Sequence, residues 1–231
     1  MSRLLCTASL ILVGWFSLPA AALENLEPYV VGNAFSAEDG AWLYSEYHRC
    51  DAQGSQCLIE YRDPDGVLLA KKALDYSGSP HAPGVFLQDF VYEESLRIAP
   101  LNDTRQVVDA GFDNFVRSSW QGLASGETVT FPFQVLGREE PIDMRAARSE
   151  QADCADTSLC LEVALDAWLL RLVVPSIELV YDRESRRLLS YRGISNLRDE
   201  GGASPMVFIR YEYQAEPAVL AAGEGPANII E

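Results

Sequence analysis

Apolar and polar residues alternate with a period of two along much of this chain, and no other feature constrains its fold as strongly. The pattern is clearest at Thr128–Val135 and at Met206–Tyr213. Successive side chains of a strand point to opposite faces, so these stretches predict strands that bury one face each. Pro132 lacks an N–H group, which predicts an edge or bulged position for the first of them. We therefore expect a mainly β fold.

Further strands are predicted on either side of turn sequences. Asp63-Pro64-Asp65-Gly66 is typical of a tight turn and would join a strand at Cys57–Tyr61 to a partner at Val67–Tyr76. The other expected strands are Trp42–His48, Leu159–Leu165 with a bend at Asp166, Ser176–Tyr181 and Arg187–Tyr191. Two polar segments, Gly137–Asp156 and Gln214–Glu231, are expected to lack regular structure.

One amphipathic helix is predicted at Ala110–Leu123. Its apolar residues fall within an arc of roughly 140° at 100° per residue, with polar residues on the other side. Asp109 is the expected N-cap and Gly126 the expected stop. The helix either packs on the sheet as part of the core or covers a ligand cavity. Together with the strands it predicts a curved antiparallel sheet, or half-barrel, wrapped on an amphipathic helix.

The N-terminal residues have the pattern of a cleaved secretory signal peptide. Arg3 is basic, Leu4–Leu18 is apolar, and small residues end the segment at Ala22. We expect cleavage between Ala22 and Leu23, a single β-rich domain at 23–213, a flexible tail at 214–231, and a periplasmic location. A retained transmembrane anchor is the alternative, but the apolar run is short and the small-residue exit is present.

Export changes the interpretation of the cysteines. Cys6 leaves with the leader, and four cysteines stay in the mature chain: Cys50, Cys57, Cys154 and Cys160. Four cysteines allow three pairings. Their close spacing favours two local disulfides, Cys50–Cys57 and Cys154–Cys160, over a zinc site, because the spacings are longer than those usual for zinc ligands.

Charge and length limit the partners. The net charge is -16 at pH 7, which argues against nucleic acid because phosphate binding draws on excess Lys and Arg. After the leader, no apolar run reaches the ~18 residues that span a bilayer, so no transmembrane segment is expected in the mature chain.

Motifs of known catalytic chemistry are missing from the sequence. It contains no G-x-S-x-G elbow, no P-loop and no H-E-x-x-H, and only two histidines, His48 and His81. An ordinary structural role is favoured for both histidines over a role as a base. Acidic residues are plentiful, but no pair is singled out for catalysis. Arg183, Arg186, Arg187, Arg192 and Arg198 crowd one region, where interleaved acids favour surface ion pairs over an anion clamp. We expect no metal and no cofactor.

Three phrases resemble sequences common in uncharacterised exported proteins of Gram-negative bacteria. They are Tyr181–Gly193 (YDRESRRLLSYRG), Asp109–Phe115 (DAGFDNF) and Asp65–Lys72 (DGVLLAKK). The expected sheet is similar to the half-barrels of periplasmic lipoprotein carriers, whose concave face accepts acyl chains. The resemblance implies a carrier-like fold and transfers no catalytic residue.

Three hypotheses for the function follow. The favoured one is a non-catalytic binding or carrier-like protein of the envelope for an apolar ligand, which is an acyl chain, a lipid or an apolar peptide. The alternatives are a carboxylate-dependent hydrolase, with His81 as a helper, and an envelope scaffold that binds a partner protein. For an apolar ligand between sheet and helix, the expected contact residues are Phe112, Phe131, Phe133 and Trp168.

Overall fold

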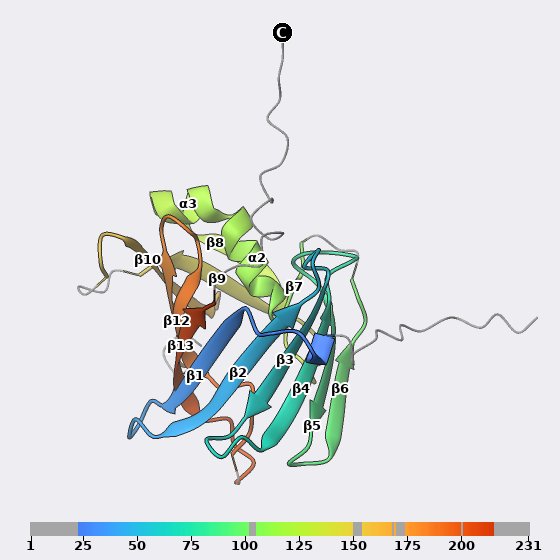
Figure 1. Cartoon of the computed structure of the whole chain (residues 1–231). Helices are drawn as coiled ribbons and strands as arrows, with labels where there is room; N and C mark the ends of the chain where they lie inside the picture. The colour runs from blue at the N-terminus through green and yellow to red at the C-terminus, as the bar shows by residue number, and fades with distance from the viewer. Residues whose placement is uncertain are drawn as a thin grey trace, which may run out of the picture.

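The computed structural model shows a mainly β protein built on one open, curved sheet (Figure 1). It describes residues 23–101, 105–149, 154–167, 169, 174–199 and 201–214. The sheet has 13 strands in the order β6-β5-β4-β3-β2-β1-β13-β12-β11-β10-β9-β8-β7 and does not close into a barrel. The predicted fold class, a curved antiparallel sheet, is confirmed.

The strand bounds match most of the predicted stretches to within a few residues. In chain order the strands are β1 (Val30–Ser36), β2 (Trp42–Cys50), β3 (Gln56–Arg62), β4 (Leu68–Asp75), β5 (Gly84–Asp89), β6 (Glu94–Ile98), β7 (Val107–Val108), β8 (Val129–Gln134), β9 (Ile142–Arg148), β10 (Ser158–Leu165), β11 (Ile177–Asp182), β12 (Leu188–Ile194) and β13 (Met206–Tyr213).

Two meanders make up the sheet, and the last strand joins them. Strands β1 to β6 pair consecutively, as do β8 to β12, and β13 pairs with both β1 and β12. Every pairing is antiparallel except the short one between β7 and β8. Strand β8, which contains Pro132, is therefore next to the edge and has only the two residues of β7 beyond it.

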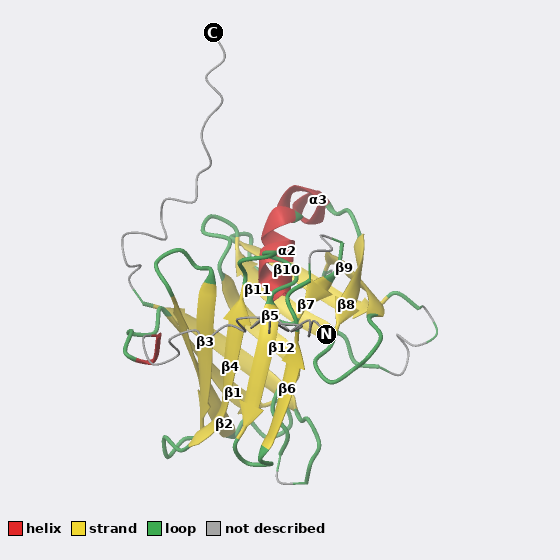
Figure 2. Cartoon of the chain, turned by 90° about the vertical axis from the view of Figure 1, so that its right-hand side faces the viewer, coloured by secondary structure: helices red, strands yellow, loops and turns green. Residues whose placement is uncertain are grey.

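The predicted helix is broken into two. α2 (Gly111–Ser118) and α3 (Trp120–Ser125) are separated at Ser119, whose backbone leaves helical geometry at φ -92° and ψ 8°. The N-cap of α2 is Ala110 and not Asp109, because Asp109 takes a left-handed φ of 44° and its carboxylate pairs with Lys72. Gly126 ends α3 with a φ of 95°, as predicted. Both helices lie at one end of the sheet (Figures 1 and 2).

Two apolar clusters form the core, both on the face that we call the inner face. The first gathers residues of β1 to β5 and β13, such as Ile59, Leu74 and Ile209. The second packs Val116, Trp120 and Leu123 of the helices against strands β8 to β11. The helices therefore cover one half of the sheet, and loop residues such as Ala82 and Leu197 pack on the other half.

The structure also tests the predicted polar segment and the predicted disulfides. The segment Gly137–Asp156 is not without structure: it contains β9, because Met144 and Ala146 alternate inward and pair with β10. Both local disulfides are present, Cys50–Cys57 and Cys154–Cys160. Disulfides are typical of proteins outside the reducing cytosol.

Other expectations fall on residues that the structure does not describe. Within the described residues, no helix is long and apolar enough to cross a membrane. The leader up to Ala22 and the tail beyond Gln214 lie outside those residues. Leu23, the first described residue, is buried.

Candidate functional site on the inner face of the sheet

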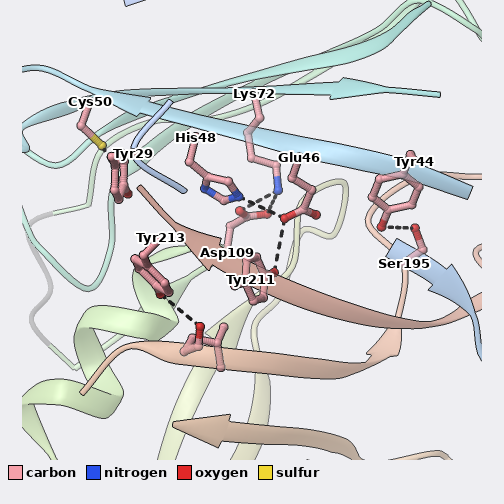
Figure 3. A network of polar contacts seen from close by, with 11 residues as sticks. Tyr29, Tyr44, Glu46, His48, Cys50, Lys72, Asp109, Ser195, Tyr211 and Tyr213 are labelled. Carbon is pink, nitrogen blue, oxygen red and sulfur yellow. Dashed lines mark hydrogen bonds and ion pairs between the residues drawn. The ribbon is translucent and has the colours of Figure 1, made fainter. Parts of the chain in front are cut away.

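Charged and hydroxyl-bearing side chains gather on the inner face beside the first apolar cluster (Figure 3). Alternation along β2 points Tyr44, Glu46 and His48 to this face, and the same rule brings Lys72 from β4 and Tyr211 from β13. Asp109, from the turn before α2, approaches them from the other side. We call these six residues the inner polar cluster.

Contacts within the inner polar cluster compensate its charges. His48 Nε2 lies 3.1 Å from Glu46 Oε2, and the Tyr211 hydroxyl donates to the same oxygen at 3.3 Å. Lys72 Nζ donates to both carboxylate oxygens of Asp109, at 2.8 and 3.0 Å. The Lys72 side chain is only 2% exposed. A charge buried this deeply requires a partner, and Asp109 supplies it.

The tyrosines around the inner polar cluster are held neutral. Burial raises the pKa of Tyr44 and Tyr211 well above the ordinary value, and the nearby Glu46 carboxylate raises it further. The same two causes, with Asp109 added, act on the pKa of Tyr61. These hydroxyls can therefore donate or accept hydrogen bonds, but they do not supply a phenolate base at neutral pH.

Helix α2 adds a charged pair near Tyr29, Tyr181 and Tyr213. Asp113 Oδ2 pairs with the Arg117 guanidinium at 2.7 Å, one turn further on. Burial raises the pKa of Asp113, with Arg117 acting in the opposite direction, although 35% of its side chain is still accessible. The carboxylate is thus surrounded by protein yet reached by solvent. Its Oδ1 and the buried Tyr181 hydroxyl have no other hydrogen-bond partner, and Tyr181 acts to lower the pKa of Asp113.

Four phenylalanine rings lie on the other side of α2. Phe112 and Phe115 of the helix meet Phe131 and Phe133 of β8, with ring centroids 4.6 to 6.4 Å apart. Phe131 is buried, and the other three are partly buried. The structure thus brings together three of the four predicted ligand contacts, Phe112, Phe131 and Phe133. Trp168 lies outside the described residues.

His81 forms a pair with Ser118 that has the composition of a catalytic dyad. Its Nε2 lies 3.1 Å from Ser118 Oγ. Ser118 Oγ also donates to the Phe115 carbonyl at 2.8 Å, so its single hydrogen is engaged and it accepts from His81. A histidine that donates to a serine is in the wrong tautomer to take its proton. The pair fastens the end of α2 to the His81 loop.

The acidic side chains on this face lie beside basic ones. Each of its acids already has a partner: Glu46 has His48, Asp109 has Lys72, and Asp113 has Arg117. In the described part of the chain, no cluster of three or more His, Cys, Asp or Glu is placed to hold a metal ion. No protein-family model matches the chain, and no curated protein shows significant similarity to it.

The sequence predicted three of the four phenylalanines on α2 and β8 as ligand contacts, but it did not reveal the inner polar cluster. The clearest indication of this cluster in the sequence is Lys72, a charged residue between Ala70 and Leu74 on the apolar side of a strand. A lysine in that position is usually paired. The identity of its partner could not be predicted, because Asp109 is 37 residues further along the chain.

Proposed function

We propose that this protein is an exported, non-catalytic binding protein of the bacterial envelope, carrier-like in that it takes an acyl chain or lipid against the inner face of its sheet. The observation that carries the proposal is the cluster of four phenylalanines between α2 and β8. Three of these rings retain contact with solvent at a seam next to the edge of an open sheet.

An apolar ligand would bind by inserting between the phenylalanine rings, where it would replace contacts that the rings now make with one another. The break at Ser119 supports this route, because it separates α2 from α3 and allows α2 to shift alone. Ser118 is tied to His81, and Asn114, in the middle of α2, is tied to the Pro80 carbonyl; both partners belong to the loop before β5. Asp113 and Arg117, on the opposite side of α2 from the rings, provide charged groups for the polar end of a lipid.

A carboxylate-dependent hydrolase is the weaker alternative. It requires an acid free to give or accept a proton, and the raised pKa of Asp113 is the single observation in its favour. The ion pair with Arg117 opposes it.

The binding proposal is tested by uptake of a dansyl-labelled fatty acid. Wild-type protein is expected to enhance the dansyl emission. Phe133→Asp is expected to abolish the enhancement, because a carboxylate among the three remaining rings disfavours an acyl chain. Phe133 is partly exposed, so the variant should fold. The matched control is Phe86→Asp on the other face of β5, which should bind like the wild type.

Two results would overturn the proposal: no dansyl enhancement with the wild-type protein, or equal enhancement with Phe133→Asp. Near-ultraviolet circular dichroism of each variant separates lost binding from lost folding. Export is checked in the same preparation by measuring the intact mass, which should match a chain that begins at Leu23. A mass that includes residues 1–22 would contradict cleavage of a signal peptide.

A further inference from the structure

The outer face of the sheet, opposite the two cores, carries a row of aromatic side chains at its centre. Phe208 of β13 lies directly across from Phe35 of β1. Phe35 lies across from Trp42 of β2, past a register shift between Ala34 and Phe35 that breaks the alternation of β2. On the other side, Phe208 faces Arg192 of β12. Arg210 follows two residues along β13. We call these five residues the outer aromatic patch.

The outer aromatic patch is hollowed and open to solvent. A depression of about 400 Å³ is lined by Phe35, Phe208, Arg192 and Arg210, together with the turn after β1. At its margin, Trp42 is 46% exposed. Large exposed aromatic side chains are uncommon on the surface of a lone protein and, when they gather, mark interaction sites.

In the described residues, the two arginines of the patch are among the cations that form no ion pair, as is Arg97 on β6. Arg49, Arg62, Lys71 and Arg198 each pair with a carboxylate. Within the described ranges, Arg192 and Arg210 take part in no ion pair, and Arg210 rests on the Phe208 ring at 5.3 Å. The expected surface pairing of Arg192 is therefore not formed. Glu178 of β11 lies across from Arg192, and Glu212 follows Arg210 on the same face of β13, but neither carboxylate is within ion-pair distance of these arginines.

We propose that the outer aromatic patch is the docking site for an acidic, extended segment of a partner protein. Trp, Phe and Arg are enriched where protein interfaces concentrate their binding energy. The charges specify the partner, because free guanidinium groups beside apolar surface bind carboxylates through paired, charge-assisted hydrogen bonds. This proposal goes beyond ligand binding on the inner face and does not depend on it.

The spacing of the arginines fits an extended segment. Arg192 and Arg210 are diagonal neighbours on adjacent strands, which places their Cβ atoms about 7–8 Å apart. In an extended peptide, side chains two residues apart point the same way and are about 6.6–7 Å apart. Two acidic residues separated by one residue in such a peptide therefore match the spacing of Arg192 and Arg210.

The test uses the full exported protein and a fluorescein-labelled peptide with the core Glu-Phe-Glu-Leu, followed by fluorescence anisotropy. Binding should weaken with added salt. Arg192→Gln and Arg210→Gln should each weaken it about tenfold, the effect of removing one charge-assisted pair. The matched control is Arg97→Gln, because Arg97 also rests on a phenylalanine ring, at 5.0 Å, but lies outside the patch on β6. It should leave the affinity unchanged.

Four outcomes would overturn the proposal. They are equal affinity for a Gln-Phe-Gln-Leu peptide, equal weakening by Arg97→Gln, binding to anionic phospholipid vesicles in place of the peptide, and self-association of the wild type that Arg192→Gln abolishes. Dansyl fatty acid uptake by Arg192→Gln should match that of the wild type, so a failed docking site is distinguishable from a failed ligand site.

Discussion

At the residue scale, Glu60 shows how one carboxylate can stabilise three neighbouring cations. It lies on the outer face of β3, 7% exposed, and its oxygens are 3.2 to 3.3 Å from nitrogens of Arg49, Arg62 and Lys71. Burial works to raise the pKa of Glu60. Three effects act against burial: the hydrogen bond from Arg62, the hydrogen bond from Lys71 and the positive charge of Arg49. Together they hold the pKa of Glu60 below its ordinary value.

Replacing this carboxylate should destabilise the protein in a pH-dependent way. Glu60→Gln is expected to cost about 3 kcal/mol at pH 7, because three cations lose their shared partner. A lowered pKa in the folded state stabilises the fold above the unfolded pKa of about 4.3, and this stabilisation is lost as the pH falls through the folded pKa. Urea unfolding at pH 7 and pH 3.5 measures it; a wild-type to variant difference that does not shrink in acid contradicts the assignment.

Lys72 and Asp109 should behave as a coupled pair. Lys72→Met leaves the Asp109 carboxylate buried without a counter-charge and is expected to cost about 3–5 kcal/mol. Adding Asp109→Asn removes that charge, and asparagine tolerates the left-handed backbone at this position. The double variant should therefore be more stable than Lys72→Met alone. The free energies of unfolding of the wild type, the two single variants and the double variant give the coupling energy between Lys72 and Asp109. If the losses of the two single variants add up in the double variant, the two side chains do not interact.

At the element scale, the position of α2 depends on a close approach to the loop before β5. A Cβ atom on Gly111 would lie 2.1 Å from the His81 carbonyl oxygen and 2.7 Å from Pro83 Cδ. Because the obstacle is largely backbone, it cannot move aside cheaply. Gly111 therefore sets how near the helix lies to the loop, and through it the packing of Phe112 and Phe115.

We expect Gly111→Ala to displace α2 and to cost about 1–3 kcal/mol, as overpacking generally does. The control is Gly122→Ala in α3, where the new Cβ would meet the mobile end of Glu127. There alanine should be neutral or stabilising by up to about 1 kcal/mol, because it favours the helix. Thermal unfolding compares the two; equal effects would show that the approach at Gly111 does not constrain α2.

At the scale of the whole molecule, the sequence predicted elements better than their connections. The period-two pattern located β13 with its observed bounds and most of the other strands, and the spacing of the cysteines indicated both disulfides. Polar content hid β9, because Arg145 and Asp143 occupy its exposed face. The inner polar cluster could not be predicted, since its members come from β2, β4, β13 and a turn, and only tertiary structure brings these together.

The pairing of β1 with β13 determines when the sheet can be completed during folding. The strands at the centre of the sheet come from opposite ends of the sequence, so the central ladder forms only after residue 206 is available. Until then, the two meanders are separate sheets, and β1 and β12 each present an open edge that invites aggregation. Contacts of such long sequence separation form late and slowly. The eight residues of β13 thus complete the sheet, and the two open edges stay available for wrong pairing until β13 is in place.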